Sequence, residues 1–340
     1  MLQAGLTNLI EIRTSGSIDH LRELGYAIPE FVSRPAQLGR QAEQFKIVNA
    51  RISQGVEQGL ITVEQAECIA HTCYTLAMAD IDGKNFPGLE IFKYQPKQEI
   101  SALVDLLSKH VRGGTPVPIF APVCPDFDDA YRFMEKGLSN AARRFFKYSP
   151  PIFANLERFN FDYHIYMHLA DADGDDRYFL ERLNLSREEF MVNVNGTRKQ
   201  IAKEIAQDKR LATKVELSLM LEAFDEKGVN YYACITHETE EIVNSRIPKV
   251  NRILADLFRE RRGRKIENSF PRSEEIKSIA CELGAYSVYG NLVGGDGLIL
   301  SADTLSGTAA YNFSLSGNKP VSPVIGIRER SINTSTSLFL

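Results

Sequence analysis

VPIFAPVCPDFDD (residues 117–129), SNAARRFFKY (139–148) and YHIYMHLADADGDD (163–176) follow one another in the middle of the chain. Two short apolar runs each end in a cluster of reactive or charged side chains, and a helical pattern connects them. This order is typical of a βαβ unit, and open parallel sheets bind ligands at the carboxyl ends of their strands. We therefore expect a functional site where these two strands end.

Helix and strand signals continue on both sides of this unit. Upstream, Thr62–Gln65 has the pattern of a capping box that begins a helix reaching about Met78, and Gln98–His110 is amphipathic. Downstream, Ser186–Glu189 is a second capping box, and its helix extends to about Gln207. Strands that alternate with helices at these lengths indicate an α/β fold with a largely parallel sheet.

The sequence after residue 210 predicts further helices and strands. We expect a helix at 211–225, a strand at 229–236, a long helix at 237–265, a helix beginning at Ser273, and final strands at 297–302 and 323–327. The predicted fold is a Rossmann-like three-layer α/β domain with a mostly parallel sheet, over residues 96–330. A mostly helical region, 1–95, precedes it, and a tail, 331–340, follows.

Composition and charge limit which partners and which cellular location we expect for this protein. The net charge of −4 gives no general attraction to nucleic acid, so such binding requires a local patch. No apolar run approaches the roughly 20 residues of a membrane span, and the N-terminus lacks a signal-peptide pattern. Five scattered cysteines favour reduced thiols. We expect a cytoplasmic protein without a membrane partner; a homo-oligomer is left open.

Two sequence patterns bear on cofactors and metals. Cys68, His71 and Cys73 lie within one predicted helix, where they do not share a face, and no second ligand pair follows. The G-x-G-x-x-G dinucleotide fingerprint is absent. The stretch DADGDD (171–176) leaves three readings open: recognition carboxylates, a Mg²⁺ or Mn²⁺ site, or a solvated loop. We expect neither a cofactor nor a metal overall.

Cys124 follows the first strand and is a candidate nucleophile. A thiolate attacks acyl groups readily, but nearby carboxylates such as Asp126 raise a thiol's pKa. A turn residue, a residue lining the site and a nucleophile are all consistent with this position.

A basic cluster and a late helix supply further candidates. The cluster comprises Arg259, Arg261, Arg262, Arg264 and Lys265. It fits either a helix C-terminus, which favours cations, or a phosphate-binding patch that Arg143, Arg144 and Lys147 could extend. Tyr286, Tyr289 and Asn291 lie on or next to the last helix, where the tyrosines fit either a pocket or an aromatic core. His164, Tyr166 and His168 share one strand face, and we expect the histidines to pack under a helix.

The order of elements over about residues 115–315 resembles two enzyme families. One is the tRNA-dependent cyclodipeptide synthases, whose fold is related to class I aminoacyl-tRNA synthetases. The other is the isocyanide synthases, which the chain resembles around PIFAPVCPD, ADADGDD and LNLSREEF. Cys124 stands where the first family has a serine, and Gly290 stands where its late Tyr-x-x-x-Glu motif has the glutamate. The lysine-bearing loop of the second family is not matched.

The first resemblance implies an aminoacyl transferase that makes cyclodipeptides from aminoacyl-tRNA without ATP, with a cationic amino acid as one expected substrate. It implies catalytic roles for Cys124, Tyr286 and Tyr289. Substrate binding is expected at Asp126, Asp171, Asp173 and Asn291, and tRNA binding at the basic cluster.

Three other functions remain open. The first is an isocyanide-synthase-like enzyme that acts on a free amino acid. The second is a metal-dependent glycosyl or nucleotidyl transferase that uses the DADGDD stretch. The third is a non-enzymatic RNA-binding α/β protein.

Overall fold

The computed structural model describes residues 35–78, 89–91, 96–125, 139–175, 180–181, 184–248, 250–251, 254–255, 272–302 and 322–327. Within these ranges, no helix combines the length and the apolar character that crossing a membrane requires.

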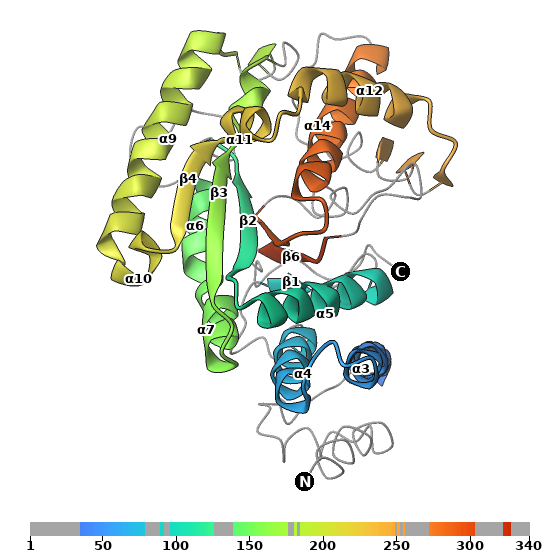
Figure 1. Cartoon of the computed structure of the whole chain (residues 1–340). Coiled ribbons are helices and arrows are strands. Elements are labelled where there is room, and N and C mark those ends of the chain that lie inside the picture. Colours follow the sequence, from blue (N-terminus) through green and yellow to red (C-terminus); the bar gives the residue numbers. More distant parts are fainter. Residues whose placement is uncertain are drawn as a thin grey trace.

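A six-stranded sheet in the order β1-β6-β5-β2-β3-β4 forms the centre of the fold (Figure 1). Its strands are β1 (Leu89–Ile91), β2 (Val117–Val123), β3 (Tyr163–Leu169), β4 (Val215–Leu219), β5 (Leu298–Ser301) and β6 (Val324–Ile327). All neighbouring strands are parallel except β1, which pairs antiparallel with β6 at the edge. In chain order the five parallel strands therefore give 3-2-1-4-5, which is the arrangement of a Rossmann-like sheet. The predicted fold class is confirmed.

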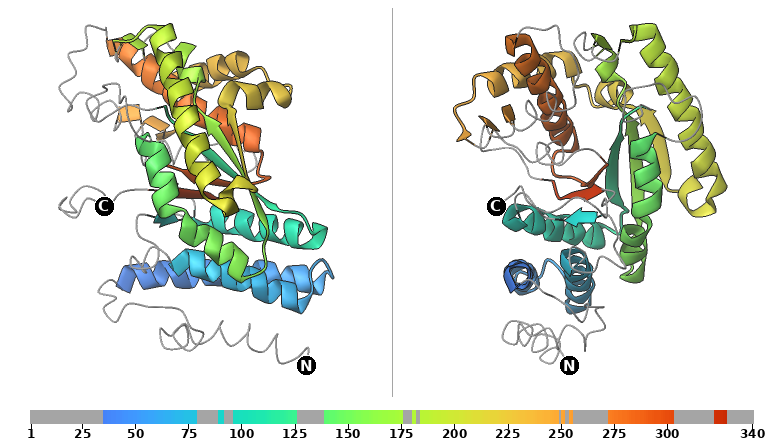
Figure 2. Two further views of the ribbon diagram at one scale, coloured as in Figure 1. Left: turned by 90° about the vertical axis from the view of Figure 1, so that its left-hand side faces the viewer. Right: turned by 180° about the vertical axis from the view of Figure 1, so that it is seen from behind.

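Helices cover both faces of the sheet and form the outer layers. They are α3 (Pro35–Glu57), α4 (Val63–Met78), α5 (Pro96–Gly113), α6 (Asn140–Tyr148), α7 (Pro150–Arg158), α9 (Arg187–Gln207), α10 (Lys209–Ala212), α11 (Met220–Glu226), α12 (Tyr231–Val243) and α14 (Arg272–Val293), with a short 3₁₀ turn η1 (Ala172–Asp175). The view from behind in Figure 2 shows α12 and α14 on one side of the sheet and α6, α7 and α9 on the other.

The alternation of side chains along the strands gives the two faces separate hydrophobic cores. On what we call the first face, Ile165 and Met167 of β3 are fully buried against residues of α5, α6, α7 and α9. On the second face, Phe120 and Ile299 pack with Tyr289 of α14 and neighbouring residues of α11 and α12. Successive residues of a strand point to opposite faces, so the same strands supply both cores.

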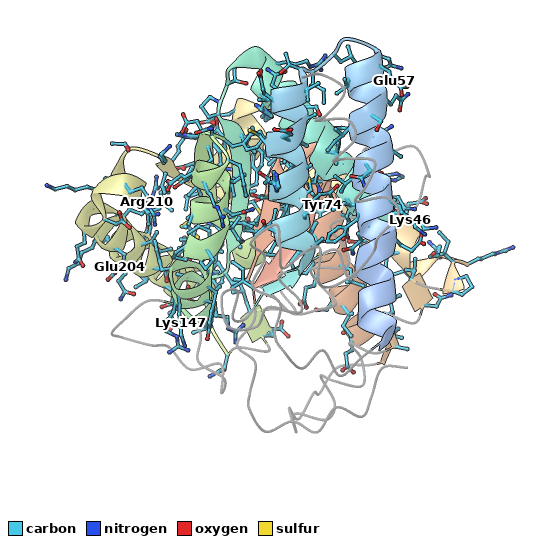
Figure 3. All side chains as sticks on the ribbon, turned by 90° about the horizontal axis from the view of Figure 1, so that it is seen from below. Lys46, Glu57, Tyr74, Lys147, Glu204 and Arg210 are labelled. Carbon is cyan, nitrogen blue, oxygen red and sulfur yellow. The ribbon has the colours of Figure 1, made fainter. Side chains whose placement is uncertain are left out.

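The N-terminal helices extend the first-face core at one end of the molecule. The hydroxyl of Tyr74 on α4 donates to Asn49 on α3, and the Asn155 side chain on α7 donates to the Thr72 carbonyl at 3.3 Å. Figure 3 shows Tyr74 between the two N-terminal helices, and Figure 1 shows α3 and α4 at the end of the molecule opposite α12. The domain boundary expected at residue 95 stays a prediction.

Both predicted capping boxes are present. At the start of α4, the Thr62 amide donates to the Gln65 side chain at 2.9 Å, and the Gln65 amide donates to the Thr62 hydroxyl at 3.2 Å. At the start of α9, Ser186 and Glu189 make the same pair of bonds at 2.7 and 3.1 Å. Each pair satisfies backbone N–H groups that a helix leaves without partners at its start.

The predictions for residues 211–236 are correct only in part, because 211–212 and 220–225 are helical, in α10 and α11. Residues 215–219 form β4 inside the predicted helix, and the predicted strand at 229–236 is the beginning of α12. The signals were present: VELSL alternates apolar and polar residues, whereas the buried residues of α12 recur at helical spacing from Tyr231 through Ile235 to Ile242. Asn230 caps α12 by accepting from the Ala233 amide at 3.1 Å.

Two further predictions need correction. The long helix expected to reach residue 265 ends at Val243, and Pro248 a few residues later disfavours helical backbone at Ile247. The mostly helical region 1–95 contains an unpredicted strand, β1, whose three residues are too few to show a period of their own.

Candidate functional site

The five parallel strands end level with one another. The register pairs Val123 with Leu169 and Leu169 with Leu219. On the other side of β2, Phe120 pairs with Ile299, and extending that register sets Ala302 level with Val123. We call this line of strand ends the carboxyl edge. The residues that follow it, Cys124 among them, leave the sheet side by side.

The strand order reverses between β2 and β5, and this reversal is where open α/β sheets form ligand crevices. The loops after β2 and β5 lie at residues 126–138 and 303–321, outside the described part of the chain. Among the described residues, Arg144 connects the helix that follows β2 with the end of β5. Its Nη1 donates to the Ala302 carbonyl at 3.3 Å. The first crossover helix is thus tied to the end of β5.

Cys124 is partly buried immediately after β2 and contacts the first-face core. Its place in the register brings it beside Ala170, whose amide donates to the Val123 carbonyl at 2.9 Å. The thiol is therefore positioned by strand pairing, and it stands at the same edge as the acidic stretch that follows β3.

Asp171 is only 5% exposed and faces the beginning of α11. Its carboxylate accepts from the Leu221 amide at 3.0 Å, which places a negative charge at a helix N-terminus. Burial raises the pKa of Asp171, and backbone N–H donors from α11 partly oppose that change. This contact joins the end of β3 to the helix that follows β4.

Asp175 connects two other elements at the rim of the carboxyl edge. Its Oδ1 accepts from Arg187 Nε at 2.7 Å, and its Oδ2 accepts from the hydroxyl of Tyr232. Burial and this carboxylate raise the pKa of Tyr232 to about 12. The turn lies so close to α9 that a Cβ at Gly174 would meet the Phe190 ring at 2.7 Å. The acidic stretch is therefore fixed against both α9 and α12.

A buried polar pair lies just inside the edge on the second face. His168 Nδ1 and the Tyr289 hydroxyl are 2.8 Å apart, and both residues are at most 5% exposed. Burial lowers the pKa of His168 to about 4, and burial raises that of Tyr289. The expectation that both histidines pack under a helix is confirmed for His168; His164 is only partly buried, and its Nε2 lies 3.6 Å from the Glu216 carboxylate on β4. Tyr286, one turn earlier on α14, is only partly buried.

The predicted site residues fall into three groups. Cys124 and Asp171 both lie at the carboxyl edge, and Tyr286 and Tyr289 lie on the helix that covers its second face. Asn291 is exposed in the last turn of α14, two residues after Tyr289. Outside the described residues or side chains are Asp126, Asp173, Arg259, Arg261, Arg262, Arg264 and Lys265.

Three contacts at the edge were not predicted from the sequence. They are the bond of Arg144 to Ala302, the bond of Tyr232 to Asp175, and the pairing of His168 with Tyr289. The helical period through Tyr231 and Ile235 would have placed Tyr232 at the start of a helix. The other two contacts depend on tertiary packing, since their partners are more than one hundred residues apart.

No group of three or more metal-ligating side chains occurs among the residues with described positions. Asp171 and Asp175 are both engaged by protein donors, as given above. Cys73 is fully buried, burial raises its pKa, and the His71 ring stacks on Phe159 at 5.5 Å. Asp171 and Asp175 are thus bound by protein donors, and His71 packs against an aromatic ring.

Comparison with known proteins gives a sparse result. No protein-family profile matches the sequence. No protein of curated function matches it either. Among solved structures, the chain is similar to a cyclodipeptide synthase from Candidatus Glomeribacter gigasporarum bound to Phe-tRNAPhe, with 14% identity and a TM-score of 0.37 over 66% of this chain and 92% of that chain. This is a distant structural resemblance, and we place no functional weight on it.

Proposed function

We propose that the chain is an aminoacyl-transfer enzyme that forms cyclodipeptides from aminoacyl-tRNA at the carboxyl edge between β2 and β5. One observation carries the proposal: the cationic helix α6 is bonded through Arg144 to the end of β5, where the strand order reverses and Cys124 leaves β2. A nucleophile next to a cationic helix suits an acyl ester carried on a polyanion.

Cys124 is the proposed acyl acceptor. Its thiolate attacks the ester of a first aminoacyl-tRNA, so that a thioester forms and the 3′-hydroxyl of the tRNA leaves. The amino group of a second aminoacyl-tRNA then attacks the thioester and restores the thiol. The free amino group of the resulting dipeptidyl ester closes the ring and releases the second tRNA. Each step exchanges one acyl bond for another, so neither ATP nor a redox partner is consumed.

The two tyrosines of α14 have different proposed roles. Tyr286 is partly buried and is the better candidate to touch the substrate and transfer protons. Tyr289 is 1% exposed and bonded to His168, so it would act by holding α14 against β3.

The acidic groups are proposed to recognise amino groups, including a cationic side chain. Asp126 and Asp173 would serve this purpose directly, while Asp171 fixes the geometry through α11. The basic cluster at residues 259–265 would hold the tRNA backbone. Asn291 is exposed in the last turn of α14, and its contact with the substrate stays a prediction.

The test is to incubate the protein with tRNA charged with each of the twenty amino acids in turn and in pairs, and to search for cyclodipeptides by mass spectrometry. We expect a product with at least one pair. The Cys124→Ala variant should lose about a hundredfold or more of that product. The matched control is Cys68→Ala, which removes a partly buried thiol from α4 at the far end of the molecule.

Absence of any cyclodipeptide with all charged tRNAs would refute the proposed function. Activity on free amino acids that survives ribonuclease would also refute it, and would favour the isocyanide-synthase-like alternative.

A further inference from the structure

The guanidinium of Arg144 carries a charge that the described protein does not balance. Its Nη1 donates to a neutral carbonyl, that of Ala302, while its Nε is buried without a hydrogen-bond partner. Within the described ranges, no ion pair involves this side chain. A partly buried cation with unused donors is costly unless an anion or water completes its contacts.

The surroundings add positive charge. Helix α6 reads NAARRFFKY, with three cations and no acidic residue. Arg143 and Lys147 are exposed, and Figure 3 shows Lys147 near the margin of the molecule. Lys147 also lies 4.8 Å from the centre of the Tyr148 ring. Arg144 differs from both because it turns inward, toward the reversal between β2 and β5.

A purely structural role does not account for this arrangement. Tying α6 to β5 takes one hydrogen bond to Ala302, which an uncharged amide side chain can also donate. A guanidinium instead offers five donors in a planar fork that matches two oxygens of a phosphate or carboxylate. The excess donors and the uncompensated charge point to an anionic ligand with more than one acceptor oxygen.

We propose that Arg144 is the phosphate-binding residue of the site and contacts a phosphoester group of the substrate. The inference rests on the proposed function for the choice of phosphate: an amino acid esterified to tRNA has no free carboxylate, so the nearest anions are phosphates. A phosphodiester close to the 3′ end of an RNA and the monoester of a sugar phosphate share this chemistry.

Binding without turnover tests the assignment. Affinity for a fluorescent single-stranded RNA ending in CCA is measured by anisotropy, and affinity for ribose 5-phosphate by calorimetry. Arg144→Gln should weaken at least one of them about tenfold or more, because a charge-assisted bond is lost. The matched control is Arg143→Gln, which removes the same charge from an exposed neighbour on the same helix and should change affinity less than about threefold.

The probes separate the two sources of phosphate. A loss confined to RNA identifies a phosphodiester, and a loss confined to ribose 5-phosphate identifies a monoester. For RNA, the slope of log affinity against log salt should decrease by about one in Arg144→Gln. If Arg144→Gln does not fold, Arg144→Lys keeps the charge but lacks the fork, and it should weaken binding more than Arg143→Lys does.

Equal losses in the Arg144 and Arg143 variants would overturn the proposal, since they would show diffuse attraction to the whole helix. Binding unchanged in both variants would overturn it as well. Neither result depends on cyclodipeptide formation, so failure of this inference and failure of the proposed function are distinguishable.

Discussion

The two faces of the sheet use the same strands for different purposes. On β3, Ile165 and Met167 point to the first face and are fully buried in its hydrophobic core. His164, Tyr166 and His168 point to the second face, where the ring contact and the buried hydrogen bond between His168 and Tyr289 connect the sheet to α14. The first face thus supplies mainly apolar burial, whereas the second face adds a polar contact that sets where α14 lies relative to the carboxyl edge.

The largest effect should come from the first face. Phe153 on α7 is 1% exposed and stacks on Tyr163 with ring centroids 5.1 Å apart. Phe153→Ala should lower the free energy of unfolding by about 3–5 kcal/mol, because it removes a large buried side chain and leaves a cavity. Urea unfolding measures this change. Val192→Ala, at a position that is 62% exposed, is the control and should change it by less than about 0.5 kcal/mol. A loss below 1 kcal/mol in Phe153→Ala would show that the first face is not the main source of stability.

An intermediate effect, dependent on pH, should come from the second face. The pKa of His168 is lowered from 6.5 to about 4 in the folded chain. Between these values the unfolded chain binds a proton that the folded chain does not, so stability falls as the pH is lowered through this window. The full loss is roughly 3 kcal/mol. Urea unfolding at pH 7 and pH 4.5 should show most of it in the wild type.

The His168→Gln variant should lack this part of the acid sensitivity, because glutamine does not titrate. His237→Gln, which changes an exposed histidine of α12, is the matched control and should respond to acid as the wild type does. Equal acid sensitivity of the His168 variant and the wild type would mean that this buried pair does not set the pH response.

The smallest effect should come from the rim of the carboxyl edge. Tyr232→Phe removes one hydrogen bond from Asp175, and Tyr232 is 48% exposed, so the free energy of unfolding should fall by at most about 1 kcal/mol. A double-mutant cycle with Asp175→Asn isolates the pair. We expect a nonzero coupling energy and faster hydrogen exchange at the start of α12. Strict additivity would show that this contact does not hold α12.

How far the sequence predicts this molecule depends on how local each signal is. Thr62–Gln65 and Ser186–Glu189 act within one helical turn, and both capping boxes are present. The apolar run of β2 is bounded by residues that end strands, so its position was also predictable. In VNYYACIT (229–236), by contrast, β-branched and aromatic residues suggested a strand, whereas the helical spacing that begins with Tyr231 and Ile235 and continues to Ile242 shows a helix.

The positions of several candidate site residues were predictable, but their contacts were not. The carboxyl edge follows from alternating strands and helices, and Cys124 and Asp171 do stand there. The contacts of each side chain at that edge involve partners distant in sequence. Asp171 accepts a hydrogen bond from the Leu221 amide, and Arg144 donates one to the Ala302 carbonyl. Residue periodicity contains no information about such pairs, because tertiary packing decides them.

The proposed substrate site is the carboxyl edge between β2 and β5. Hydrogen–deuterium exchange with and without a saturating RNA minihelix charged with a stable amide-linked amino acid tests it most directly. We expect added protection at the ends of β2 and β5 and along α6, and none in α3 and α4, which lie at the far end of the molecule (Figure 1). Protection in α3 and α4 without any change at residues 117–125 and 139–148 would contradict it.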